Sequence, residues 1–136
     1  MSVDVSATFF ILIKIVKKLE PLFILKDAFI TLAIESWRLS RFTEELIQSE
    51  DRLKETKYER KIAWFNDQLE ETLEACDLRL VNLENSIFDL GMPVKAINIS
   101  EFKESKDLII IKMLEPVVMC GDRLERSGTV LLADKP

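Results

Sequence analysis

Residues 113–133 read MLEPVVMCGDRLERSGTVLLA and carry the clearest β pattern of this 136-residue chain. The apolar run Pro116–Met119 is followed by Cys120-Gly121-Asp122, which has the composition of a turn, and Thr129–Leu132 is a second apolar run. Apolar, β-branched runs on either side of a glycine-containing turn are typical of paired β-strands. The sequence therefore predicts a strand, a turn and a strand at this end of the chain.

The residues just before this stretch also favour β structure. Leu108–Ile111 (LIII) is a short apolar run of high β-propensity, and a polar stretch, Ser100–Asp107, precedes it. We therefore expect residues 92–136 to form a small β domain. A unit of only about 40 residues has little core of its own, so it should depend on packing against helices or a partner.

Residues 1–91 are expected to form helices. The strongest helical pattern lies between residues 69 and 90, where apolar residues are spaced 4, 3, 4, 3, 4, 3 and the positions between them are mostly charged. This spacing is typical of a coiled-coil seam, and Gly91 followed by Pro93 predicts the end of the helix. The predicted dimer or helix seam consists of Leu69, Leu73, Cys76, Leu80, Leu83, Ile87 and Leu90.

Two further helices are predicted upstream of this seam. Val3–Leu19 is apolar nearly all round, although the alternation of isoleucines at 11, 13 and 15 also fits a strand. Pro21–Gln48 has a second helical pattern, and Pro21 either begins a new helix or kinks a continuing one. The expected fold class is mainly α with a small β appendage (α+β), the long helices forming a dimeric bundle or coiled coil.

The first segment also raises the question of a membrane. The apolar run Ala7–Ile13 is interrupted by Lys14, far short of the roughly 20 residues that a membrane-spanning helix needs. The lysines follow this run, whereas a secretory signal has its positive charge before it. Lys14, Lys17 and Lys18 beside aromatic residues resemble an interfacial helix. We favour a core helix or dimer seam over membrane binding, and expect a cytoplasmic protein.

Composition argues against catalysis and against nucleic-acid binding. Nineteen basic and 24 acidic residues give a net charge of −5, and the chain has no histidine. Its three glycines match no phosphate-binding loop, and Cys76 and Cys120 lie 44 positions apart. Glu70, Glu74 and Asp77 share a predicted helix face, which we interpret as solvated rather than as a metal site. We therefore expect no enzyme, metal or cofactor.

The end of the chain resembles the GrpE family, the nucleotide exchange factors of Hsp70 chaperones. That family closes with an apolar strand, a turn, an Arg-x-x-Arg step, two small residues and an alternating strand. The helix end at Leu90-Gly91, the following Pro93-Val94 and the Leu19-Glu20-Pro21-Leu22 segment are also similar to the family. The family's Gly-Tyr pair before the turn is replaced by Val117-Val118, and the family's long N-terminal paired helix is expected to be truncated or reorganised here. The matching residues in the last hairpin are Arg123, Arg126, Ser127, Gly128, Val130 and Leu132.

The resemblance implies a homodimer whose helices form a bundle and whose β domains contact the ATPase domain of an Hsp70. Such a factor promotes nucleotide exchange by binding the open cleft better than the closed one. It also implies partner contacts at Arg123, Arg126, Val130 and Leu132, with Arg123 bonding a partner carboxylate. An interpretation of equal weight is that Arg123 is a solvated turn residue and that Leu132 is a core residue without a partner contact. The alternative function is a non-catalytic helical scaffold that oligomerises and binds another protein.

Overall fold

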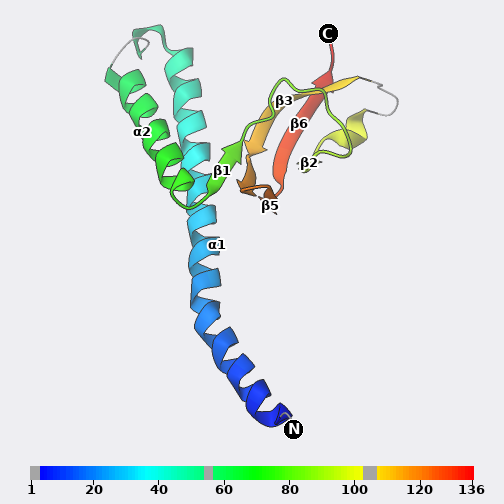
Figure 1. Cartoon of the computed structure of the whole chain (residues 1–136). Coiled ribbons are helices and arrows are strands. Elements are labelled where there is room, and N and C mark those ends of the chain that lie inside the picture. The colour runs from blue at the N-terminus through cyan, green and yellow to red at the C-terminus, as the bar shows by residue number, and fades with distance from the viewer. Residues whose placement is uncertain (1–3, 54–56, 103–106) are drawn as a thin grey trace. The chain divides into compact units, whose positions relative to one another are not determined.

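The computed structural model describes residues 4–53, 57–102 and 107–136. Within these ranges the chain forms two helices and then six strands in two small sheets, so the predicted α+β class with helices first is confirmed. Figure 1 shows this order from the N-terminus to the C-terminus. The chain divides into two compact units, Met1–Leu32 and Ala33–Pro136, which we call unit 1 and unit 2.

The first helix, α1, runs without a break over Val5–Ser49, so it contributes to both units. Asp4 begins it, and its carboxylate accepts a hydrogen bond from the backbone N–H of Ser6 at 3.1 Å. Pro21 lies inside the helix, so the continuing helix is the alternative that the structure adopts and a separate second helix is wrong. The strand alternative at residues 11–15 is wrong as well. A proline inside a helix removes one backbone hydrogen bond, and the other backbone bonds keep the helix continuous.

The second helix, α2, covers only Lys57–Glu74, so the predicted helix through Leu90 is wrong. The chain turns immediately after α2, where Asp77 has a left-handed φ of 57°, and it turns again at Asn85 with φ 68°. Between these turns β1, Leu78–Val81, pairs antiparallel with β4, Val117–Cys120. Of the predicted seam, Leu69 and Leu73 lie on α2, Cys76 in the turn, Leu80 on β1, and Leu83, Ile87 and Leu90 in the irregular segment that follows.

The strands form two three-stranded sheets, β1-β4-β5 and β2-β6-β3. Strands β4 and β5 are antiparallel neighbours across the turn at Gly121, where φ is +56°. Strand β5 was not predicted; the predicted second strand, Thr129–Leu132, lies in β6, which pairs with β2 and β3 in the other sheet. Strand β2, in the chain segment between α2 and β3, pairs in parallel with β6, the last strand. The remaining strands are β2 (Val94–Ala96), β3 (Leu108–Glu115), β5 (Arg123–Arg126) and β6 (Gly128–Asp134), with 3-10 helices at Asp51–Leu53 and Ile99–Glu101.

An apolar cluster of buried residues lies inside the β region. Ile110 and Val130 are fully buried, and Trp37 of α1 packs against the same cluster from the helical side. The expectation that a small β domain leans on a helix is therefore met inside unit 2. The first strand lies before residue 92, so the β region begins earlier than expected. The buried members of the cluster are Leu108, Ile110, Met113, Val117, Val130 and Leu132.

Gly128, the first residue of β6, has no room for a side chain. A Cβ there would lie 2.9 Å from the carbonyl oxygen of Glu115 and 2.8 Å from the methyl group of Met113. Gly128→Ala should therefore lower the free energy of unfolding by about 1–3 kcal/mol, because backbone must move to relieve the overlap. Urea unfolding measures this loss. In Gly91→Ala, the matched control, the new Cβ meets Asp89 no closer than 3.6 Å, so the midpoint should stay near wild type; equal midpoints for both variants would contradict the packing.

Candidate functional site

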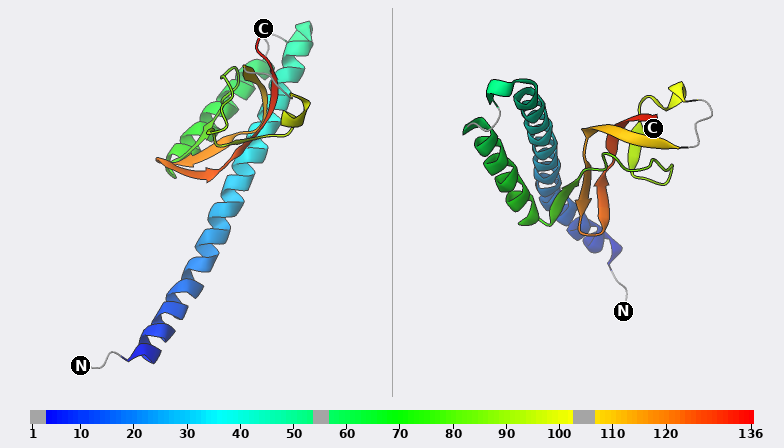
Figure 2. Two further views of the ribbon diagram at one scale, coloured as in Figure 1. Left: turned by 90° about the vertical axis from the view of Figure 1, so that its right-hand side faces the viewer. Right: turned by 90° about the horizontal axis from the view of Figure 1, so that it is seen from above.

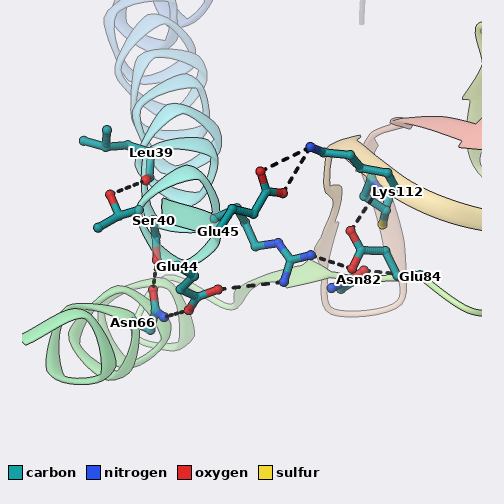
Figure 3. Close-up of polar contacts among 11 residues, drawn as sticks. Leu39, Ser40, Glu44, Glu45, Asn66, Asn82, Glu84 and Lys112 are labelled. Carbon is teal, nitrogen blue, oxygen red and sulfur yellow. Dashed lines mark hydrogen bonds and ion pairs between the residues drawn. The ribbon is translucent and has the colours of Figure 1, made fainter. Parts of the chain in front are cut away.

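A polar cluster centred on Arg41 joins the helices of unit 2 to its β region. Nη2 of Arg41 lies 2.5 Å from Oε2 of Glu84, in the segment that follows β1. Nη1 lies 3.8 Å from Oε2 of Glu44, one turn further along α1. The guanidinium also lies over the ring of Trp37, 5.6 Å from its centre. In Figure 3, dashed lines join the labelled Glu44 and Glu84 to the guanidinium that lies between them.

Glu84 is bonded from both sides. The backbone N–H of Met113, on β3, donates to its Oε1 at 3.0 Å while Arg41 binds the other oxygen. Desolvation acts to raise the pKa of this carboxyl, but the bonds from Met113 and Arg41 outweigh it and lower the pKa below its ordinary value. Glu84 is therefore ionised at neutral pH and ties a helix to a strand.

The same cluster extends to α2. The Ser40 hydroxyl donates to Oδ1 of Asn66, and Nδ2 of Asn66 donates to Oε1 of Glu44 at 2.7 Å (Figure 3). Ser40 is buried, so this bond satisfies a hydroxyl that would otherwise be costly inside the protein. The two helices lie side by side around these residues (Figure 2). Further along α1, Glu45 pairs with Nζ of Lys112 on β3 at 3.0 Å.

A pocket of about 560 Å³ opens beside this cluster, between α1, α2 and β1. Its apolar walls include Trp37, Leu69 and Leu73, and Arg41 and Arg79 add positive charge. Mixed apolar and charged walls suit a side chain of a protein partner more than bond chemistry. The hydroxyl of Ser40 is engaged by an amide rather than by a base. Among the described residues no group of three or more acidic or cysteine side chains could hold a metal ion.

The four residues predicted to contact a partner separate into two kinds. Val130 and Leu132 are 0% and 2% exposed and belong to the core, as the core alternative for Leu132 requires. Arg123 has a side chain that is 69% exposed at the start of β5. Arg126 is half-buried at the other end of the same strand, opposite Val118.

The Arg123 guanidinium has hydrogen-bond donors left for a charged partner group. Its Nε and Nη2 both donate to Oε1 of Glu125, at 3.1 and 2.6 Å. The hydrogen bond and the charge of Glu125 raise the pKa of Arg123 further above its ordinary value, so the guanidinium is always positive. A guanidinium has five N–H donors, and these two bonds leave donors for an incoming carboxylate.

Sequence reasoning missed the Arg41 cluster. Arg41 and Glu84 are 43 positions apart, and nothing in either local pattern links them. One signal was present: Trp37 and Arg41 are spaced four apart, so they share a face of any helix that contains both. The spacing predicts the contact between Trp37 and Arg41 but not the ion pair with Glu84.

Large apolar side chains are exposed on both helices of unit 2. Leu39, Phe42 and Leu46 of α1 follow the 3–4 spacing of one helix stripe and are 64%, 62% and 50% exposed. Trp64 of α2 is 66% exposed. Contiguous apolar surface of this kind is typical of a protein interface.

No helix in the described part of the chain is long and apolar enough to cross a membrane. Comparison with protein-family models, with curated proteins and with solved structures finds no match for this chain.

Replacing Glu84 tests the cluster. Because the folded state lowers the pKa of Glu84, its ionised form stabilises the protein above about pH 4.5 and the contribution is lost as the pH falls through the folded value. Glu84→Gln should lower the free energy of unfolding at pH 7 by about 1–2 kcal/mol, since it loses charge-assisted bonds. Urea unfolding at pH 7 and pH 3 should show that this difference shrinks in acid.

The matched control is Glu45→Gln, because Glu45 also pairs with a cation from the β region but its side chain is 51% exposed. Exposed pairs contribute little, so this variant should stay within about 0.5 kcal/mol of wild type. A Glu84 variant that loses no more than the Glu45 variant would show that the Arg41 cluster does not hold the two parts of unit 2 together.

Proposed function

We propose that this protein is a GrpE-like co-chaperone that binds the ATPase domain of an Hsp70-type chaperone in the cytoplasm and promotes nucleotide exchange. The single observation that carries the proposal is the exposed, permanently charged Arg123 at the tip of a β hairpin that follows a pair of helices. This is the position at which the resemblance implies a partner contact. The order of elements, helices first and small sheets after, agrees with it.

The contact that we propose is made by Arg123, with Arg126 beside it on β5. Charge-assisted bonds from arginine to carboxylate are strong and directional, so one such contact can fix the orientation of a partner. Buried Val130 and Leu132 are not part of this surface; they support it, because β6 and β3 form the core beneath the strands. The Arg41 cluster couples this core to the helices.

Exchange by this route requires no bond chemistry in the exchange factor. The factor shifts the ATPase toward its open cleft only by the difference between its affinities for the open and closed forms. A rigid β unit is suited to that task, because it does not deform to fit both forms equally. The absence of histidine from the sequence agrees with a role of this kind.

We further propose that the protein acts as a homodimer through the helices of unit 2. The stripe Leu39, Phe42 and Leu46, together with Trp64, offers apolar surface on two neighbouring helices. Two such helix pairs can bury these side chains against each other in a bundle. The same stripe also supports the alternative function, a helical scaffold that oligomerises and binds a different protein.

Release of a fluorescent ADP from a panel of Hsp70 ATPase domains tests the exchange activity. Wild-type protein should accelerate release by roughly tenfold or more from its partner ATPase. Arg123→Ala should raise the protein concentration required for half-maximal acceleration about tenfold, because one charge-assisted contact with the ATPase is lost. Stopped-flow fluorescence gives both values.

The matched control for Arg123 is Arg52→Ala, which removes another exposed arginine that pairs with a nearby glutamate, from the 3-10 helix Asp51–Leu53. It should behave as wild type. If wild-type protein accelerates release from none of the ATPase domains, the exchange function is refuted, whereas equal activity of the Arg123 and wild-type proteins would refute only the proposed contact.

The dimer is tested by Leu39→Gln combined with Phe42→Gln. Removing two exposed apolar groups from the stripe should convert the dimer to a monomer without loss of fold, since neither side chain belongs to the core. Light scattering measures the mass and circular dichroism the helix content. Leu90→Gln is the control, because Leu90 is 85% exposed outside the helices; a double variant that remains a dimer would contradict the proposed interface.

A further inference from the structure

The first four turns of α1, Val5–Leu19 in unit 1, have a composition unlike the rest of the chain. The segment contains three lysines and no acidic residue, so its charge is +3 in a protein of net charge −5. Its large apolar side chains are exposed, for example Phe9 at 62% and Val16 at 57%. Apolar surface of this extent on a charged segment needs an explanation beyond solubility.

The lysines lie on the side of the helix opposite most of the apolar groups, and Phe10 alone of the large apolar residues falls between Lys14 and Lys17. Successive residues advance by about 100° around a helix, so residues spaced 4, 3, 4 and 3 form one stripe while the lysines fall on the other side. Ile11 and Ile15 lie beside the stripe and widen it, and both are exposed. We call the following residues the N-terminal stripe: Val5, Phe9, Leu12, Val16 and Leu19.

The lysines are available for an external anion. Lys14, Lys17 and Lys18 are exposed, and within the described residues none of the three forms an ion pair. Lysine side chains beside an apolar stripe can extend to the lipid headgroups while their methylene groups remain among apolar chains. A helix with a basic side and a wide apolar side lies in the plane of a membrane surface.

The sequence alone favoured a core helix or dimer seam here, but the structure leaves the apolar side chains exposed, and we propose that Val5–Leu19 binds the surface of a membrane that contains anionic lipids. The stripe enters the boundary between headgroups and acyl chains, and the three lysines bind the headgroup charges. The charge favours this occupant over the same segment of a second copy, because that pairing would place two segments of charge +3 side by side. The width favours it too, since a two-stranded seam covers only a narrow stripe and leaves Ile11 outside.

This mode of binding differs from spanning. About 15 helical residues extend roughly 22 Å, which is shorter than the hydrocarbon core of a bilayer. The lysines, spaced along one side, would also be costly inside that core. The segment therefore attaches the protein to a surface reversibly and leaves the helices and sheets of unit 2 in water.

Co-sedimentation of the whole protein with vesicles tests this inference. Vesicles of phosphatidylcholine with one third phosphatidylserine should bind wild-type protein, and pure phosphatidylcholine vesicles should bind it about a hundredfold more weakly, because each lysine near an anionic surface strengthens binding about fivefold. Raising the salt concentration to 0.5 M should weaken binding to the anionic vesicles.

Two variants separate the parts of the site. Replacing Lys14, Lys17 and Lys18 with Gln should reduce anionic-vesicle binding to the level seen with neutral vesicles. The matched control replaces Lys61, Lys95 and Lys135, three exposed lysines of unit 2, with Gln and should leave binding unchanged. Phe9→Gln combined with Val16→Gln should abolish binding to both vesicle types, because it removes the apolar contact.

Three results would overturn the inference: no sedimentation of wild-type protein with anionic vesicles, equal binding by the two triple-lysine variants, or conversion of a dimer to a monomer by the Phe9 and Val16 substitutions. The last result, read by light scattering, would show that a second copy covers the N-terminal stripe. Circular dichroism of each variant establishes that the helices are retained. Loss of vesicle binding leaves ADP release untouched, so this inference and the proposed exchange function fail independently.

Discussion

The ion pair between Arg41 and Glu84 is the interaction on which unit 2 depends. It connects the C-terminal part of α1 to the segment that follows the first strand, and a backbone N–H of β3 donates to the same carboxylate. A charge that is partly removed from water requires full compensation, and Glu84 obtains it from a guanidinium and a peptide N–H. Trp37 completes the arrangement, because it packs against the β core and lies beneath Arg41.

This constraint explains how so small a β region is held in one arrangement. Its core has six buried members, few for a separate domain, and a helix side chain covers part of it. Once that core is fixed to the helices, the hairpin of β4 and β5 presents Arg123 from a firm support. In the proposed complex, the helices of unit 2 therefore fix the position of the hairpin that offers Arg123 to the partner.

The sequence predicted those parts of the fold that local pattern determines. The apolar runs at Leu108–Ile111, Pro116–Met119 and Thr129–Leu132 predicted strands, and β3, β4 and β6 confirm them. Strand β5, which pairs with β4 across Gly121, has no apolar run and was not predicted. The helix through Leu90 was predicted because its apolar spacing fits a heptad, but that spacing also permits a strand at Leu78–Val81. The strand is formed because it pairs with β4, some 40 positions later in the chain. A local sequence pattern carries no information about such a distant partner. For the same reason the Arg41 cluster could not be predicted, whereas exposed Arg123 could.

The central claim is that this protein recognises the open, nucleotide-free form of an Hsp70-type ATPase. Light scattering of the purified protein mixed with a nucleotide-free ATPase domain measures this most directly. We expect a complex whose mass exceeds that of either component and which dissociates when ATP is added, because a nucleotide that favours the closed cleft opposes a factor that binds the open one. A protein whose mass is unchanged by every ATPase domain, with or without nucleotide, would contradict it.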